Sequence, residues 1–260
     1  MKLLFVGDVI ARPGRRALAA LLPGLIDRNR VDYVIVNVEN SAGGSGPTPE
    51  VWHELSELPI DCFTSGNHIW DKKETLPLLE REPNLLRPAN YPAGNPGKGL
   101  HVGETAAGIK VATLNLEGRV FMKTLDSPFE VADRLLAGLP SDVKVRFVDF
   151  HAEATSEKQA LGFYLDGRIS AMVGTHTHVP TADERILPKG TAFQTDAGMT
   201  GPYESVIGVR ADRVIERFLL QTGQPFDTAK NDVRLAGTLF DIDEATGKAR
   251  GVERVLVAQG

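Results

Sequence analysis

The sequence has little of what marks three specialised classes of protein. Its 260 residues include one cysteine, Cys62, which excludes an intramolecular disulfide. No apolar run approaches the roughly 20 residues of a membrane-spanning helix, which argues against a membrane protein. The formal net charge is −5, and the chain has no dense run of Lys and Arg. Proteins that hold long nucleic acid contact many phosphates through such residues, so extended nucleic-acid binding is not expected.

The composition is otherwise that of an ordinary globular protein. Hydrophobic residues make up 42% of the chain and charged residues 24%, and the length suits one sizeable core, so a single domain over 1–260 is expected. The apolar stretch at 3–6 is shorter than the core of a secretion signal, and a cytoplasmic protein is the simplest interpretation. Cys62 lies in the apolar run 60–63, which is typical of a core thiol rather than a nucleophile.

Apolar runs and segments with helical spacing alternate along most of the chain. Strands are predicted at 3–6, 31–38, 60–64, 111–116, 143–150 and 169–173. Helices are predicted from Pro13 to about Leu25 and over 50–58, 73–81, 129–136 and 156–165, whereas 84–98 is rich in Pro, Gly and Asn and predicts a loop. This alternation indicates an α/β fold with a parallel sheet.

The pattern changes after Val179. An antiparallel β tail is predicted at Ile186 and over 191–194, 235–242 and 249–257, with one helix at about 211–220 and a loop at 197–201. The C-terminal half is therefore expected to complete a second sheet.

Polar clusters stand where the predicted strands end. Their carboxylate, carboxamide and imidazole groups are metal-binding types, and the carboxyl ends of parallel strands meet at one crevice. The five segments are therefore expected to share one sheet edge and to form a metal site of a two-metal hydrolase. They are Gly7-Asp8, Glu39-Asn40, Gly66-Asn67-His68, His151 and Gly174-Thr175-His176-Thr177-His178.

Each cluster also has an ordinary structural alternative. An Asp such as Asp8 is commonly a cap or turn residue, and Glu39-Asn40 before several glycines also fits a turn. Side chains at 176 and 178 on an extended strand would face opposite ways, so a turn, which Gly174 permits, must bring both imidazoles to one centre. His53 and His101 have no such neighbours and are expected at the surface, in a helix and a loop respectively.

The order of these motifs resembles the calcineurin-like metallophosphoesterase superfamily, and more narrowly its YmdB-like branch of 2′,3′-cyclic nucleotide phosphodiesterases. The resemblance runs from Gly7 to the loop ending at Gly201. Two positions depart from the common superfamily pattern: Ile10 stands where the first motif usually has His, and Glu39-Asn40 stands where Gly-Asp is usual. The YmdB-like branch shares both departures. The resemblance implies a four-layer α-β-β-α sandwich with two mixed sheets.

The resemblance also implies a role for each residue of the clusters. One metal would be held by Asp8, Glu39, Asn40 and His178, and the other by Glu39, Asn67, His151 and His176, with Glu39 bridging. His68 would be a catalytic residue beside the leaving-group oxygen rather than a ligand, and Asn67 and His68 would contact the substrate phosphate. A homo-oligomer is a further implication.

The expected chemistry follows from such a pair of ions. A hydroxide bridging two divalent ions attacks phosphorus in line, and imidazolium at His68 protonates the departing ribose oxygen. Three imidazoles among oxygen ligands suit Fe, Mn or Zn; iron and manganese are favoured, partly from the resemblance, and zinc remains open. The expected substrate is a small cyclic nucleotide of the 2′,3′-cAMP type.

Several alternatives stay open at this level. A phosphomonoesterase or nucleotidase would use the same metals, and a regulatory scaffold would keep the fold with weak hydrolysis. Arg12 either binds a substrate phosphate or is a solvated arginine at a helix start, and Tyr91 either stacks on a base or packs in the core.

Overall fold

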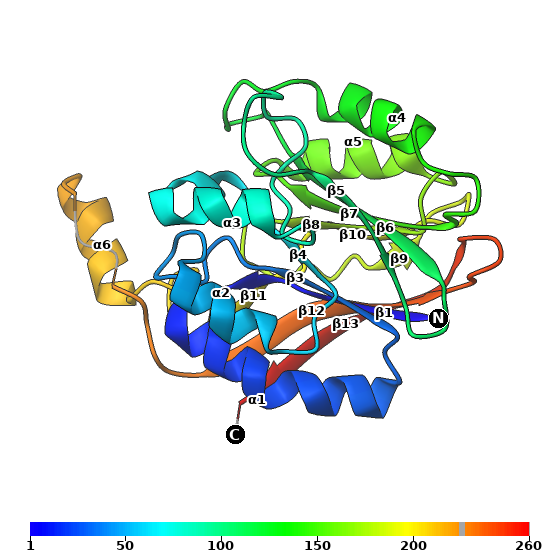
Figure 1. Ribbon diagram of the computed structural model, residues 1–260. Helices are drawn as coiled ribbons and strands as arrows, with labels where there is room; N and C mark the ends of the chain where they lie inside the picture. Colours follow the sequence, from blue (N-terminus) through cyan, green and yellow to red (C-terminus); the bar gives the residue numbers. More distant parts are fainter. Residues whose placement is uncertain (224–226, 260) are drawn as a thin grey trace.

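The structure is a computed structural model that describes residues 1–223 and 227–259, which form two mixed β-sheets and six α-helices (Figure 1). The first sheet has the strand order β2 (Asp8–Val9), β11 (Met199–Pro202), β12 (Val233–Ile242), β1 (Lys2–Val6), β3 (Tyr33–Asn37) and β4 (Cys62–Thr64), with β13 (Ala249–Ala258) paired to β12. The second has the order β5 (Leu100–Glu104), β6 (Lys110–Glu117), β7 (Val145–His151), β8 (Ala171–Thr175), β10 (Ala192–Gln194) and β9 (Arg185–Ile186). The helices are α1 (Ala11–Asn29), α2 (Pro49–Ser56), α3 (Leu76–Arg81), α4 (Pro128–Ala137), α5 (Thr155–Leu165) and α6 (Ala211–Leu220), with short 3₁₀ turns η1 (Asn67–Trp70) and η2 (Lys73–Thr75).

The β-α alternation predicted from the sequence is confirmed. In the first sheet β1, β3 and β4 run parallel, and in the second β6, β7 and β8 do so. Thr48 caps α2 by accepting a hydrogen bond from the backbone N–H of Val51, and Pro49 occupies the first turn, where its missing N–H costs nothing. The apolar stripe of α1, including Leu18 and Leu22, is buried.

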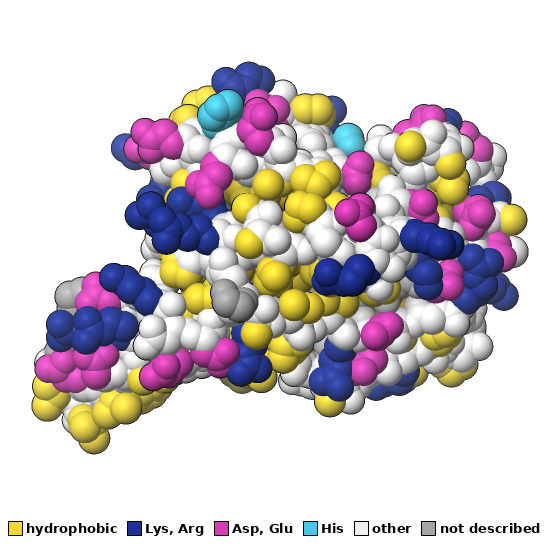
Figure 2. Space-filling view, turned by 90° about the horizontal axis from the view of Figure 1, so that it is seen from below, with side chains coloured by type: hydrophobic (Ala, Val, Ile, Leu, Met, Phe, Trp, Pro, Cys, Tyr) yellow, Lys and Arg dark blue, Asp and Glu magenta, His cyan; other side chains and the backbone are white. Residues whose placement is uncertain are grey.

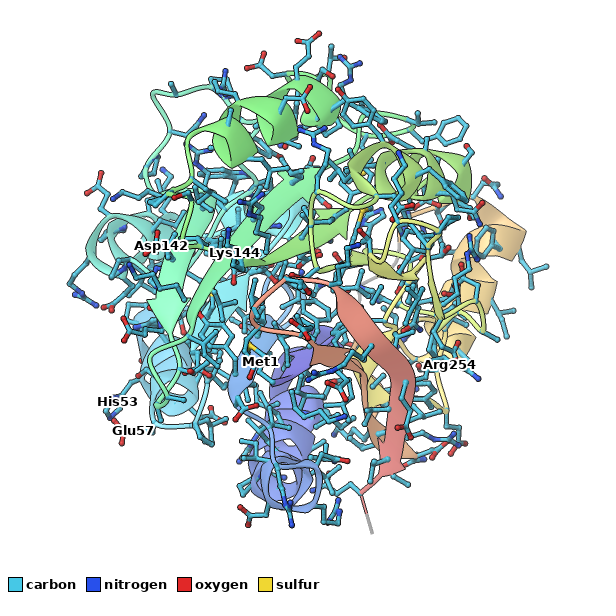
Figure 3. The ribbon with its side chains drawn as sticks, turned by 90° about the vertical axis from the view of Figure 1, so that its right-hand side faces the viewer. Met1, His53, Glu57, Asp142, Lys144 and Arg254 are labelled. Atoms are coloured by element: carbon cyan, nitrogen blue, oxygen red, sulfur yellow. The ribbon has the colours of Figure 1, made fainter. Side chains whose placement is uncertain are left out.

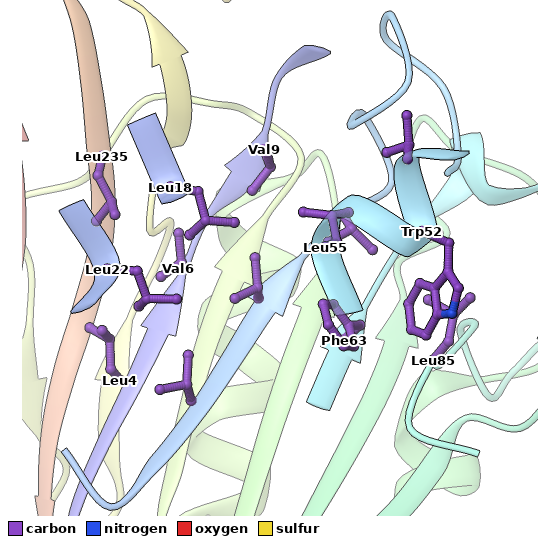
Figure 4. Close-up of a cluster of buried hydrophobic side chains, with 14 of the residues drawn as sticks. Leu4, Val6, Val9, Leu18, Leu22, Trp52, Leu55, Phe63, Leu85 and Leu235 are labelled. Atoms are coloured by element: carbon purple, nitrogen blue, oxygen red, sulfur yellow. The ribbon is translucent and has the colours of Figure 1, made fainter. Parts of the chain in front are cut away.

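Apolar side chains fill three spaces, one between the sheets and one on the outer side of each. On β1, Leu4 and Val6 pack against α1 and α2, whereas Leu3 and Phe5 face the second sheet, as the two-residue period of a strand requires. Figure 4 shows the cluster on the outer side of the first sheet, where Leu18 and Leu22 of α1 pack against the strands. The ring centroids of Phe5 and Phe147, from different sheets, lie 5.3 Å apart. The α4 and α5 helices cover the other side of the second sheet (Figure 1).

The structure corrects the predicted organisation of the second half of the chain. The strand β10 runs parallel to β8, and the C-terminal hairpin of β12 and β13 joins β1 in the first sheet instead of completing the second. The segment predicted as a loop at 197–201 contains β11, which pairs with β2 and β12. The strand β5 was not predicted, because Gly103 and two charged or imidazole residues interrupt its apolar pattern.

The outer surface carries both signs of charge. Figure 2 shows Lys and Arg in separate groups among Asp and Glu on the described part of one face, without a continuous basic stripe. In Figure 1 the α6 helix stands away from the sheets, and none of its residues is buried. Within the described residues, every helix is too short or too polar to cross a membrane.

Candidate metal centre

The predicted site residues come together at one end of the molecule, although they belong to two sheets rather than to one sheet edge. Asp8 begins β2 directly after β1, Glu39 and Asn40 follow β3, and η1 follows β4, all in the first sheet. His151 is the last residue of β7, and His176 follows β8, both in the second sheet. The expectation of a single shared edge is therefore wrong, because the two sheets pack face to face with their strand ends side by side.

Three side-chain atoms surround one ring nitrogen of His151. Its Nε2 lies 3.1 Å from Glu39 Oε1, 3.0 Å from Asn67 Oδ1 and 3.1 Å from His176 Nδ1. A single proton on that nitrogen can satisfy only one of these three acceptors. One ligand atom each from Glu39, His151 and His176 lies within 4.8 Å of the other two, as the ligands of one metal ion would.

For each imidazole, the hydrogen bond made by the outer ring nitrogen determines the protonation of the inner nitrogen, which faces this centre. Thr175 donates its hydroxyl to Asp149, so its oxygen accepts from Nδ1–H of His151 at 2.9 Å. The outer nitrogen of His176, Nε2, faces the carboxylate of Glu153 at 3.0 Å and must donate to it. In the neutral form of each ring the inner nitrogen then keeps a lone pair, which is the form that binds metal.

A second group of donors adjoins the first through Glu39. The side-chain nitrogen of Asn40 lies 3.2 Å from Asp8 Oδ1, 3.1 Å from Glu39 Oε1 and 3.4 Å from His178 Nε2. His178 Nδ1 donates to the carbonyl oxygen of Ile207 at 3.0 Å, so its Nε2 also keeps a lone pair on the inner side. Turning the Asn40 amide by 180° would place its oxygen among the same atoms.

The carboxylates of Asp8 and Glu39 are fully buried. Glu39 lies beside His151, and Asp8 lies beside His178. Burial raises the pKa of Asp8, which His178 opposes. For Glu39, His151 and the His68 backbone N–H outweigh burial and lower the pKa to about 2. Burial would lower the pKa of His151, but Glu39 raises it to about 9, whereas burial and His151 lower that of His176 to about 3. The proton on His151 compensates the negative charge of the two buried carboxylates only in part. A metal cation would compensate the rest, and it fits the donor set.

Local backbone geometry directs the two imidazoles. His176 has φ +93° and His178 has φ +64°, a left-handed conformation that costs of order 1–3 kcal/mol for such a residue. These two residues themselves make the turn that Gly174 is expected to permit. Gly174 instead allows a close backbone approach, because a Cβ there would collide with the carbonyl oxygen of Thr195. Gly66 allows the close approach that was expected, because a Cβ on it would lie 2.2 Å from the His151 ring.

A buried ion pair supports this strained turn, and the sequence did not single it out. Lys158 on α5 is 1% exposed and its Nζ lies 2.7 Å from Asp196 Oδ2. The same carboxylate accepts from the backbone N–H and the hydroxyl of Thr177, the residue between the two histidines. The pair therefore ties the turn between the two candidate ligands, His176 and His178, to α5.

Lys158→Met is expected to weaken metal binding about 10–100-fold, the usual cost of losing a group that orients a ligand. It should also lower the free energy of unfolding by about 3–5 kcal/mol, because the charge of Asp196 stays buried without its partner. Metal titration and denaturant unfolding measure the two effects. Lys144→Met, at an exposed lysine labelled in Figure 3, is the matched control. Unchanged metal affinity in a destabilised Lys158→Met protein would contradict the positioning role.

His68 lies at the rim of the site and its side chain is 41% exposed. Its backbone N–H donates to Glu39 Oε2 at 3.0 Å, and its ring Nδ1 lies 2.7 Å from Asp71 Oδ2. The carboxylate accepts from Nδ1–H, so Nε2 is the nitrogen available to a substrate. Asp71 was not singled out from the sequence, because an exposed Asp after a 3₁₀ turn has no distinctive pattern.

The remaining candidates lie outside the cluster. Arg12 is exposed and lines a cavity to which none of the metal-centre residues contributes. Tyr91 is buried, with its ring centroid 5.0 Å from that of Trp70, which confirms a packing residue. His53 points outward from α2 (Figure 3), as expected, but His101 is half-buried on β5 rather than in a loop. Cys62 is fully buried, which confirms the core thiol.

Comparison with known proteins assigns the chain to a family. The family model described as "YmdB-like protein" matches residues 4–255. The chain belongs to the YmdB-like family. It is 48% identical over 257 residues to the 2′,3′-cyclic-nucleotide 2′-phosphodiesterase of Bacillus subtilis (strain 168), covering 99% of this chain and 97% of that protein.

Two solved structures of similar chains share the fold. A protein from Thermus thermophilus, described as hypothetical, is 44% identical with a TM-score of 0.93 and 100% coverage of both chains. A protein from Mycoplasma pneumoniae, described as a novel phosphatase, is 35% identical with a TM-score of 0.93, covering 99% of this chain and 93% of that one. The family resemblance inferred from the motifs is thereby confirmed.

Proposed function

We propose that this member of the YmdB-like family is a metal-dependent phosphodiesterase that hydrolyses small cyclic nucleotides of the 2′,3′-cAMP type. The observation that carries the proposal is the convergence of Glu39, Asn67 and His176 on one nitrogen of His151, which a single proton cannot satisfy. The name of the Bacillus subtilis relative supports the phosphodiester class. The proposal includes the α-β-β-α order of four layers.

Two divalent ions would be held by these residues. The first would be bound by the set Asp8, Glu39, Asn40 and His178, and the second by the set Glu39, Asn67, His151 and His176, with Glu39 common to both. When bound, the ions lower the pKa of the attacking water and neutralise charge on the phosphoryl oxygens. Three imidazoles with carboxylate and amide oxygens favour iron or manganese, with zinc as the alternative.

The residues of the chain itself orient the substrate and move one proton. Asn67 and the ring of His68 stand at the open side of the site, where a phosphate enters. His68 Nε2 protonates the leaving ribose oxygen, while Asp71 holds the ring through Nδ1. Glu39 accepts the backbone N–H of His68, so the proton donor is placed relative to the centre by a main-chain contact.

Small substrates are favoured by the distribution of charge. The net charge is −5 and the described part of the face in Figure 2 carries mixed signs, so a long polyanion meets no continuous attractive field on that face. Binding then rests on the ions and a few local contacts, and kcat/KM should fall only slightly with added salt.

Parallel assays on bis-p-nitrophenyl phosphate and p-nitrophenyl phosphate, followed by 2′,3′-cAMP and single-stranded RNA, test this function. We expect the diester to be preferred to the monoester, and 2′,3′-cAMP to be cleaved faster than RNA. Preference for the monoester would indicate a nucleotidase, and activity on neither would indicate a regulatory scaffold. Efficient cleavage of RNA with a steep salt dependence would indicate a nuclease.

A further inference from the structure

The cavity lined by Arg12 opens beside the N-terminal turn of α1, and several of its lining residues are cations. Its volume is about 730 Å³, within the range of small-molecule sites. The basic lining residues are Arg12, Arg15, Arg16, Lys72 and Lys230. Acidic residues do not contribute to its lining within the described part of the chain.

Most of these cations have no counter-charge. Arg15 is engaged, with Nε 2.8 Å from Glu54 Oε2 and Nη1 donating to the carbonyl oxygen of Ser41. Within residues 1–223 and 227–259, no acidic side chain forms an ion pair with Arg12, Arg16, Lys72 or Lys230. Four like charges gathered around one hollow repel one another, and a multiply charged anion would relieve that repulsion.

The neutral part of the lining is mostly apolar, with Thr228 and Gln259 as its polar members. Pro13 on α1, Ala42 in the loop after β3, Val51 on α2 and Val233 on β12 face the same cavity. Such a surface can pack against a ring or a sugar, but it makes no favourable contact with a bare inorganic anion. A ligand that matches the whole cavity therefore combines several negative charges with an apolar, ring-bearing part.

The cavity is distinct from the metal centre. Ala42 and Gly43 line it, whereas Asn40, two residues earlier, faces Asp8 and His178. On its other side Lys72 follows Asp71, the partner of His68. The loop 40–46 thus lies between the candidate metal centre, whose donors suit cations, and the cavity, whose lining carries Arg and Lys side chains.

We propose that this cavity binds a nucleotide carrying two or more phosphates, with the phosphates among Arg12, Arg16, Lys72 and Lys230 and the nucleoside on the apolar floor. Guanidinium groups bind phosphate oxygens through two parallel hydrogen bonds, and lysine contributes as a point charge. The binding is independent of phosphodiester hydrolysis, so the proposed function can fail while this proposal stands.

Calorimetric titration with ATP, AMP and inorganic tripolyphosphate tests the proposal. We expect one molecule of ATP to bind per chain, about tenfold or more tighter than AMP or tripolyphosphate. Arg16→Ala and Lys72→Ala should each weaken ATP binding about tenfold, equivalent to about 1.4 kcal/mol. Arg28→Ala is the matched control, because Arg28 is also an exposed arginine on α1 but lies outside the cavity.

The same titration on Glu39→Gln protein separates the two sites. That variant is expected to hold neither metal ion, so the metal centre can neither bind ATP nor lose ions to it. Retained ATP binding in Glu39→Gln supports the cavity. Loss of binding there, with Arg16→Ala unaffected, would overturn the proposal in favour of the metal centre. Equal weakening by Arg28→Ala would show unspecific charge attraction, and equal affinities for ATP and tripolyphosphate would overturn the nucleotide assignment.

Discussion

Glu39→Gln is expected to remove both metal ions and to lower phosphodiesterase activity at least about 10⁴-fold. Glu39 is the one residue common to both donor groups, and its two oxygens face His151 and the His68 backbone N–H. Glutamine has the same shape but lacks the charge that compensates the cations. A 10⁴-fold fall in activity is only a small part of the rate enhancement that enzymes achieve over the uncatalysed hydrolysis of phosphate esters.

Metal analysis and steady-state kinetics on the same preparation measure this effect. Glu54→Gln is the matched control, because Glu54 is an exposed glutamate on α2 that pairs with Arg15. Thermal unfolding should show a folded Glu39→Gln protein, because the pKa of His151 falls once Glu39 loses its charge, and the ring becomes neutral instead of staying a buried, unpaired cation. Full metal content together with normal turnover would be inconsistent with a bridging role.

His68→Ala is expected to lower kcat on 2′,3′-cAMP about 10²–10⁴-fold, the usual contribution of a general acid, with metal content nearly unchanged. The backbone N–H of His68, not its ring, contacts Glu39, so alanine preserves that hydrogen bond. The loss should be much smaller on bis-p-nitrophenyl phosphate, because p-nitrophenolate leaves without needing a proton. Asp71→Asn should act in the same direction with a smaller effect.

The comparison of the two substrates separates a proton donor from a structural residue. His53→Ala, at an exposed histidine on α2, should change neither rate. An equal loss on both substrates would argue against proton donation. Loss of bound metal from His68→Ala would instead make His68 a ligand.

The sequence was sufficient to predict the elements that bring the candidate ligands together. The apolar runs before Asp8, Glu39 and His151 are buried strands, and the polar residues at their ends do meet. The division into two sheets could not be predicted, because a buried strand has the same apolar pattern in either sheet. The short strands β2 and β11 owe their conformation to pairing with each other rather than to local propensity.

Residues that support the candidate ligands were harder to find from the sequence than the candidates themselves. Lys158 is one polar residue on a helix, and only the tertiary structure shows that it is buried against Asp196. Asp149 lies within an apolar strand, and its role in orienting His151 depends on Thr175 in the neighbouring strand. The turn at 176–178 uses left-handed conformations at two histidines, which no local preference would predict.

Anomalous diffraction from crystals of protein purified without chelator or added metal tests the central claim most directly. Data on both sides of the iron, manganese and zinc absorption edges identify each ion at its position. We predict two transition-metal peaks, one among Asp8, Glu39, Asn40 and His178 and the other among Glu39, Asn67, His151 and His176. A single peak, or no transition-metal peak at these residues, would contradict a two-metal centre.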